Sequence, residues 1–260
     1  MKNLIFKILR YSGLPFFFRE FIQKNKISIL LVHDIKKEDA AKAFAYINRK
    51  YKIISLQQYI DAVLNNGKLP NKALIITFDD GHISNYELLP LIKKHQIPVT
   101  IFLCASIINT RRHFWFLHEP ISSMVEDWKK IPNQLRLKKL EEYGFEQEKE
   151  YEIRQALDKT ELDEMKEWVD FQSHTSFHPV LPQCNNAEAA AEIIGSKQIL
   201  ENDFQLNINT LSYPNGDYSE RDIELAKTAG YVCGITVDYG YNTIDSDLLD
   251  RKSTRLNSSH

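Results

Sequence analysis

Two aspartates that directly follow an apolar strand constrain this chain more than any other stretch. Residues 73–78 are almost wholly apolar, which predicts a buried strand, and Asp79, Asp80 and Gly81 follow at once. Neighbouring carboxylates repel each other and are costly to bury without a counter-charge. A metal ion removes that cost if one carboxylate ligates it, and the other carboxylate then stays available as a base. The alternative is a solvated turn at the end of the strand.

Strand and helix signals alternate along most of the chain. Apolar runs predict strands at 27–32, 73–78, 98–103 and 232–237, and further strands are predicted at 169–173 and 210–213. Helical spacing recurs between them at 38–51, 56–66, 85–95, 187–202 and 220–230. This order predicts an α/β fold in which helices wrap a parallel sheet.

Residues 105–168 depart from the alternation. They are rich in Glu, Lys, Arg and Trp, and their spacing predicts helices at 120–130, 135–143, 148–157 and 161–167. No Gly-, Ser- or Pro-rich linker bounds them, so we interpret them as a helical insertion rather than as a separate domain.

Composition excludes several classes of protein. The 260 residues include 43% hydrophobic and 26% charged residues, which is ordinary for a globular chain. A formal charge of −2, without a basic tract, gives no case for nucleic-acid binding. The three cysteines are odd in number and far apart, which excludes a disulfide framework and fits a reducing compartment.

The two ends of the chain differ from the middle. Residues 1–26 mix basic and bulky apolar residues without a signal-peptide core, and no stretch has the 18 or more apolar residues of a membrane span. We expect an amphipathic segment that covers the barrel floor or rests on the inner leaflet, and a cytoplasmic or peripheral inner-membrane location. Residues 252–260 are polar and aperiodic, and we expect a non-native tail that adds nothing to the fold.

A histidine pair supplies the second chemical signal. His174 and His178 are four residues apart just beyond a predicted strand, and two imidazoles at that spacing can converge on one ion. A pair of surface histidines is the alternative. With one carboxylate from the Asp-Asp pair, they would form an open three-ligand site suited to Zn²⁺, or to Co²⁺, Ni²⁺ or Fe²⁺.

These motifs resemble those of a known family. Residues 77–81 (Thr-Phe-Asp-Asp-Gly) and 174–178 (His-Thr-Ser-Phe-His) are similar to the first two motifs of the polysaccharide deacetylases, also called the NodB-homology domain or carbohydrate esterase family 4. Residues 30–34, 84–85, 212–216 and 229–240 resemble further family segments in the same order, with features of the exopolysaccharide-deacetylating subgroup. The resemblance spans residues 27–251 and implies a catalytic domain built as a distorted (β/α)7-type barrel of parallel strands.

The resemblance also implies roles for individual residues. Asp80, His174 and His178 would bind one divalent ion, with Zn²⁺ as the first choice, and Asp79 would be the general base. The backbone N–H of Asn215 would stabilise the oxyanion. The implied reaction removes N-acetyl groups from the sugars of a polysaccharide by metal-activated water. Substrate contacts are expected at Pro214, Gly216, His33 and Trp115.

The chain departs from the family pattern at several positions. Ser212 stands where an arginine often orients the base, and Arg251 is a candidate replacement or a solvated charge. The family's final motif, with a histidine that acts as general acid, has no match. His33 and His82 are candidate substitutes, but a structural role is favoured for each: a hydrogen bond at the strand end for His33 and a solvent-facing position for His82. Trp115, with Phe114 and Phe116, is either a sugar-stacking platform or a hydrophobic anchor.

Two other functions remain open at this level. The same fold and metal site could hydrolyse a small cyclic amide. A glycan-binding protein with little or no turnover is the alternative from another class, motivated by Ser212 and the unmatched final motif.

Overall fold

Eight parallel strands form the centre of the described part of the molecule. The computed structural model describes residues 11–245, 247–249 and 254–255. Along the sheet the strands run in the order β7-β6-β5-β4-β3-β1-β8, every pairing is parallel, and β2 pairs with the start of β3. The strands are β1 (Ser28–Val32), β2 (Lys52–Ile53), β3 (Ala73–Phe78), β4 (Val99–Leu103), β5 (Val169–Ser173), β6 (Thr210–Ser212), β7 (Cys233–Ile235) and β8 (Thr254–Arg255).

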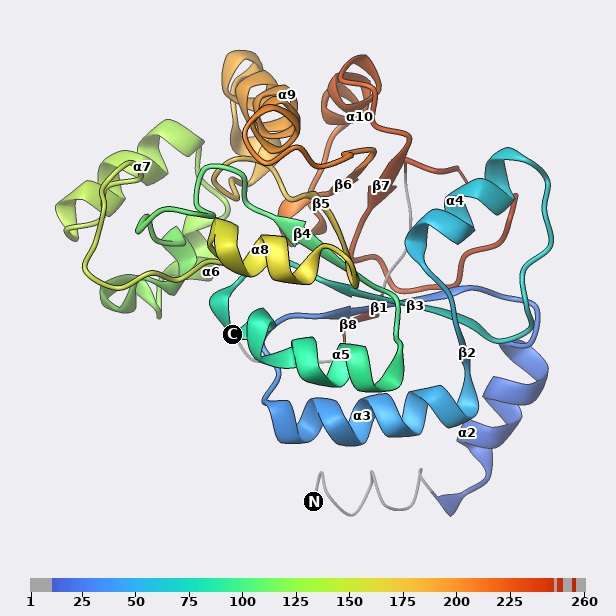
Figure 1. Ribbon diagram of the computed structural model, residues 1–260. Helices are drawn as coiled ribbons and strands as arrows, with labels where there is room; N and C mark the ends of the chain where they lie inside the picture. The colour runs from blue at the N-terminus through green and yellow to red at the C-terminus, as the bar shows by residue number, and fades with distance from the viewer. Residues whose placement is uncertain (1–10, 246, 250–253, 256–260) are drawn as a thin grey trace.

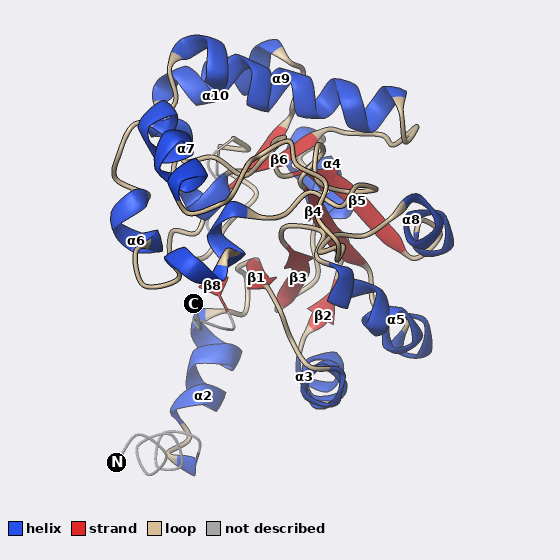
Figure 2. Cartoon of the chain, turned by 90° about the vertical axis from the view of Figure 1, so that its left-hand side faces the viewer, coloured by secondary structure: helices blue, strands red, loops and turns tan. Residues whose placement is uncertain are grey.

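Helices cover the outside of this curled sheet. Helices α3 and α5 lie on one side of the strands and α9 and α10 on another (Figure 1), and Figure 2 shows that α3, α5, α8, α9 and α10 follow the curved sheet in an arc. The expected α/β architecture, a distorted barrel of parallel strands, is confirmed. The helices in this layer are α3 (Lys37–Lys50), α5 (Leu89–His95), α8 (Lys159–Met165), α9 (Asn186–Asn202) and α10 (Glu220–Thr228), whereas α4 (Leu56–Leu64) packs against the other face of the sheet.

Strand β3 is covered on both faces, as its continuous apolar run predicts. Leu74, Ile76 and Phe78 belong to the core cluster beneath the outer helices. Ile75 points the other way, into a second cluster that also contains Tyr59 of α4. Because successive strand side chains alternate between faces, this double burial requires apolar residues at consecutive positions.

The insertion has a small core of its own. Trp115, Trp128, Leu140 and Phe145 pack together away from the main clusters. The regular elements between β4 and β5 are α6 (Val125–Trp128), α7 (Asn133–Glu142), α8 and the 3₁₀ turns η3 (Trp115–Leu117) and η4 (Glu119–Ile121). The insertion contains helices and 3₁₀ turns and no β-sheet of its own.

The helix predicted over 148–157 is wrong. That segment is irregular, with a turn, bends and one isolated β-bridge, and its backbone groups pair with neighbouring loops: Tyr151 N–H bonds to Arg111 O, Leu157 N–H to Gly81 O, and Gln155 O accepts from Ile83. These tertiary hydrogen bonds satisfy the same groups that a helix would satisfy.

The amino-terminal segment is described only from residue 11, so the expectation for residues 1–10 lies outside the described residues. Helix α2 (Leu14–Phe17) continues into the π-helix η1 (Phe18–Ile22) and extends away from the barrel in Figure 2. Its large apolar side chains are exposed, so the expectation that this stretch covers the barrel floor is wrong.

Two residues of the carboxyl-terminal tail take part in the sheet. Thr254 and Arg255 form β8 and pair in parallel with Leu30 and Leu31 of β1. The expectation that residues 252–260 contribute nothing to the fold is therefore wrong at these positions. Their non-native origin stays a prediction.

Candidate metal centre

The residues singled out from the sequence gather at one edge of the sheet. Asp79 and Asp80 follow β3, His33 follows β1, and His174 follows β5. Parallel strands present their carboxyl ends on the same side, so residues far apart in the chain meet there. A cavity of about 320 Å³ opens at this edge. It is lined by His33, Asp79, Asp80, His178 and Asn215 and, from the insertion, by Phe116, Leu117, Glu119, Ser122, Val125, Glu126 and Lys129.

A larger hollow elsewhere lacks the groups for this chemistry. It has a volume of about 550 Å³ and lies against the start of β1 and the inner side of α3. Its described lining is apolar and tyrosine-rich, with neither a histidine nor a carboxylate. We assign the chemistry to the cavity of about 320 Å³, because its lining combines two histidines with the Asp79–Asp80 pair.

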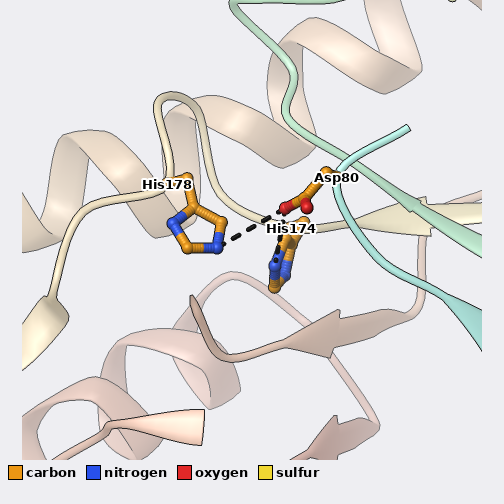
Figure 3. Close-up of side chains that lie close together, drawn as sticks. All are labelled: Asp80, His174 and His178. Atoms are coloured by element: carbon orange, nitrogen blue, oxygen red, sulfur yellow. Dashed lines mark ion pairs between the residues drawn. The ribbon is translucent and has the colours of Figure 1, made fainter. Parts of the chain in front are cut away.

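Three side chains point at a common centre in this cavity. The Nε2 atoms of His174 and His178 each lie 3.5 Å from Oδ1 of Asp80 (Figure 3). All three ligand atoms lie within 4.8 Å of one another. The two histidines are buried and Asp80 is 14% exposed, so the centre is reached from the cavity side.

The protonation of the histidines suits a metal. Nδ1 of His174 lies 2.7 Å from the carbonyl oxygen of Ser212. A carbonyl can only accept, so Nδ1 carries the proton and Nε2 presents a lone pair toward Asp80. Burial first, and then the neighbouring imidazole of His174, holds the pKa of His178 well below its usual range. Two neutral imidazoles and a carboxylate fit a divalent ion such as Zn²⁺, Co²⁺, Ni²⁺ or Fe²⁺.

Asp79 lies beside this centre and is held by a different residue. Its carboxylate is 5% exposed and accepts a hydrogen bond from Oγ of Ser212 at 3.3 Å. Its other oxygen is 3.7 Å from Nε2 of His174. Ser212, the position where the family often has arginine, thus contacts Asp79 through its hydroxyl and His174 through its carbonyl.

Backbone conformation accounts for the glycine after the aspartates. Asp80 and Gly81 both have positive φ, 72° and 68°, which turns the chain sharply out of β3. A Cβ on Gly81 would lie 2.6 Å from Cδ2 of Leu103. Glycine adopts this conformation without strain, and any larger residue would require the Leu103 side chain to shift.

The Pro-Asn-Gly turn after β6 faces the same cavity. Asn215 has φ of 58° and lines the cavity, and its buried Nδ2 has no hydrogen-bond partner among the residues that the structure describes. Gly216 has φ of 79°, and a Cβ there would lie 2.7 Å from the backbone nitrogen of Val237. A residue that lines the cavity with such an amide donor suits an oxyanion site.

Of four other residues named from the sequence, one lines the cavity, two do not, and one lies outside the described residues. His33 lines the cavity. Trp115 is 4% exposed, its Nε1 donates to the carbonyl of His178 at 2.8 Å, and the guanidinium of Arg136 covers its ring. Its ring is therefore not available to stack on a sugar, and Trp115 is a hydrophobic anchor of the insertion. Arg251 lies outside the described residues. His82 bonds to Ser84 and does not line the cavity.

One residue next to the site, Glu192, was not predicted from the sequence. Glu192, on α9, is 9% exposed and contacts the loop that joins the two histidines. The sequence pattern that could have indicated it is the position of Glu192 on the buried face of α9, which also carries Ala189, Ile193 and Ser196. A carboxylate on such a face normally has a specific partner.

Comparison with known proteins identifies relatives over most of the chain. Residues 66–234 match the family described as polysaccharide deacetylase. The Bacillus subtilis protein YxkH, named for the same family, is 23% identical over 233 residues, which cover 86% of this chain and 68% of YxkH.

Solved structures share the fold. The structure of IcaB from Ammonifex degensii superposes with a TM-score of 0.68 at 17% identity and covers 90% of this chain and 93% of its own. The deacetylase PplD of Streptococcus pyogenes, solved in complex with acetate, gives a TM-score of 0.65 at 21% identity, with 90% and 93% covered.

Proposed function

Because this chain belongs to the polysaccharide deacetylase family, we propose that it is a metal-dependent hydrolase that removes N-acetyl groups from the sugars of a polysaccharide. The observation that carries the proposal is the convergence of Asp80, His174 and His178 in a cavity that Asp79 also lines. These three residues would hold one divalent ion. A bound ion would supply Lewis acidity, which makes water a stronger acid and polarises the acetyl carbonyl.

Asp79 is the general base in this proposal. It is buried at the cavity wall, next to the ligand centre, and Ser212 fixes one of its oxygens. The second oxygen can therefore accept a proton from the attacking water without a change of rotamer. Asp80 has the other role, because its Oδ1 faces both imidazoles.

Asn215 is proposed to stabilise the oxyanion formed by attack on the acetyl carbonyl. Asn215 lines the cavity from the Pro-Asn-Gly turn, and its buried side-chain amide is a further donor there, in addition to its backbone N–H. One such donor is typically worth about 10²–10³ in rate.

The departing amine needs a proton, and His33 is our candidate donor. It lines the same cavity from the end of β1, whereas His82 is engaged with Ser84. Replacing His33 with Ala should lower kcat and flatten the alkaline limb of its pH profile, because a proton donor is lost there.

Acetate release is the direct test of the activity. Chitooligosaccharides and poly-N-acetylglucosamine are incubated with metal-stripped protein and with protein reloaded with Zn²⁺ or Co²⁺. We expect release only from the reloaded protein. A protein that holds stoichiometric metal and binds the glycan without release would instead be a glycan-binding protein, and hydrolysis of small cyclic amides alone would support the alternative substrate class.

We further propose that the enzyme works against an anionic membrane surface. Six large apolar side chains between residues 11 and 21 are 47–80% exposed: Tyr11, Leu14, Phe16, Phe17, Phe18 and Phe21. Residues 1–26 contain six basic residues and one acidic residue, a local formal charge of +5 in a chain of −2. Apolar bulk beside positive charge favours the headgroup region of anionic lipids, at roughly 1 kcal/mol per basic residue.

Membrane contact of this kind would be peripheral. No helix in the described part of the chain is long and apolar enough to cross a bilayer. Co-sedimentation with phosphatidylglycerol vesicles should exceed that with phosphatidylcholine vesicles, fall with salt, and fall strongly in a Phe17→Ser, Phe21→Ser variant. Ile153→Ser, at an apolar residue of the insertion that is 73% exposed, is the control and should not change binding. Equal loss in both variants would contradict the proposal.

A further inference from the structure

The loop that joins the two candidate ligands has a strained backbone. In this segment, residues 174–178 (the ligand loop), Thr175 has φ of 65° and His178 has φ of 57°. Both are non-glycine residues in the left-handed region, and Thr is β-branched, so this conformation costs free energy. Such strain persists only where the surroundings hold the chain in place.

Glu192 supplies the main hold on this loop. Its Oε2 accepts hydrogen bonds from the backbone N–H groups of Ser176 at 2.8 Å and Phe177 at 2.9 Å. The hydroxyl of Thr175 also bonds to the carboxyl group. One side chain on α9 therefore fixes all three residues between the histidines.

The same loop is fixed at its far end. The indole N–H of Trp115 donates to the carbonyl of His178, and His178 N–H donates to Oγ1 of Thr175. Among these contacts, the one from Glu192 ties the turn to a long helix of the barrel. Glu192 is therefore buried for a structural reason, and it has no role in the hydrolytic steps described above.

The electrostatic environment of Glu192 shows that burying its carboxyl group is energetically unfavourable. Burial raises the pKa of Glu192 to about 7, against the lowering effect of its backbone hydrogen bonds and of Arg136. A carboxylate that is so poorly solvated is retained where its hydrogen bonds are needed.

We propose that Glu192 is a positioning residue that sets the affinity and geometry of the metal centre by holding the ligand loop in its strained conformation. This inference rests on the proposed metal site. Glu192 has no role in proton transfer in this proposal, because it does not line the cavity. It acts through Ser176 and Phe177 on the two histidines that flank them.

Metal binding tests the proposal without reference to turnover. Zn²⁺ affinity is measured by chelator competition, the ligand geometry by the visible spectrum of the Co²⁺ form, and folding by the Tm of metal-free protein. Glu192→Ala should weaken Zn²⁺ binding about 10- to 100-fold and alter the Co²⁺ spectrum. Glu192→Gln keeps an acceptor oxygen at the same reach and should restore affinity to within a few-fold of wild type.

A control separates positioning from general destabilisation. Ile193→Ala removes a fully buried neighbour on α9 whose side chain cannot form hydrogen bonds to the ligand loop. It should lower Tm and leave the Zn²⁺ affinity unchanged. If Glu192→Ala does not fold, Glu192→Asp, one methylene shorter, carries the same test.

Two results would overturn the inference. One is a Glu192→Ala protein that binds Zn²⁺ as tightly as wild type, with the same Co²⁺ spectrum. The other is an equal loss of affinity in Ile193→Ala at the same fall in Tm. If wild-type protein itself bound no metal, the proposed function would fail first, and that outcome is distinguishable from either of these.

Discussion

Replacing Glu192 with Gln should change how the stability of the protein depends on pH. Burial raises the pKa of Glu192 from 4.5 to about 7 in the folded protein. A carboxyl group with a raised folded-state pKa contributes stability that is fully present below the unfolded pKa, near 4.5, and is lost as pH rises through about 7. This rise in pKa corresponds to about 3 kcal/mol, most of which is lost between about pH 5 and pH 8.

Urea unfolding of metal-free wild type and Glu192→Gln at about pH 5 and pH 8 measures this effect. The two proteins share every other titrating group, so the contributions of those groups cancel in the difference of unfolding free energies. From the lower to the higher pH the variant should gain about 2 to 3 kcal/mol relative to wild type. If the difference between the two proteins is the same at both pH values, Glu192 titrates in the folded protein as it does in the unfolded chain, and the reasoning is refuted.

Three further substitutions test individual contacts. Ser212→Ala removes the hydroxyl that holds Asp79 but keeps the carbonyl that holds His174, so kcat should fall about tenfold while Zn²⁺ affinity is unchanged; loss of both together would contradict the separation. Trp115→Phe removes the bond to His178 O and should weaken Zn²⁺ binding several-fold in a chelator competition, whereas a change confined to glycan binding would support a stacking role. Gly216→Ala places a Cβ 2.7 Å from Val237 N at positive φ and should lower the unfolding free energy by about 1–3 kcal/mol or more, well beyond Gly144→Ala, where φ is also positive but the space is open.

Much of the barrel could be predicted because its strands are buried on both faces. A short, continuous apolar run such as 73–78 is typical of a strand covered on both sides, and the polar residues after each run mark the edge where parallel strands end. The approach of Asp80 to His174 and His178 follows from the same topology. The pattern of strand ends therefore carries information about the site as well as about the fold.

The features that the sequence could not predict depend on tertiary partners. Segment 148–157 has helix-forming residues, but its N–H and C=O groups bond to the loops at 81–83 and 111. The aromatic trio around Trp115 gives no indication which ring faces solvent, and the answer depends on the hydrogen bond to His178 O. Glu192 is one acid among many until α9 is seen against the ligand loop.

The departure at Ser212 shows how contact geometry can alter the meaning of a motif. From the sequence, a serine in place of arginine weakens the case for an oriented base. In the fold, its hydroxyl reaches Asp79 and its carbonyl fixes the tautomer of His174. A neutral donor replaces a charged one, and the base keeps a hydrogen-bonded oxygen.

The most direct test of the metal-dependent mechanism is a measurement of metal content and acetate release on one sample of Asp79→Asn. We expect about one Zn²⁺ per chain, as in wild type, because Asp79 is not among the three proposed ligands. We expect acetate release from N-acetylated oligosaccharide to fall about 10²- to 10⁴-fold, because the general base is lost. Wild-type release by a fully loaded Asp79→Asn protein would contradict the assignment of the base and the division of roles between Asp79 and Asp80.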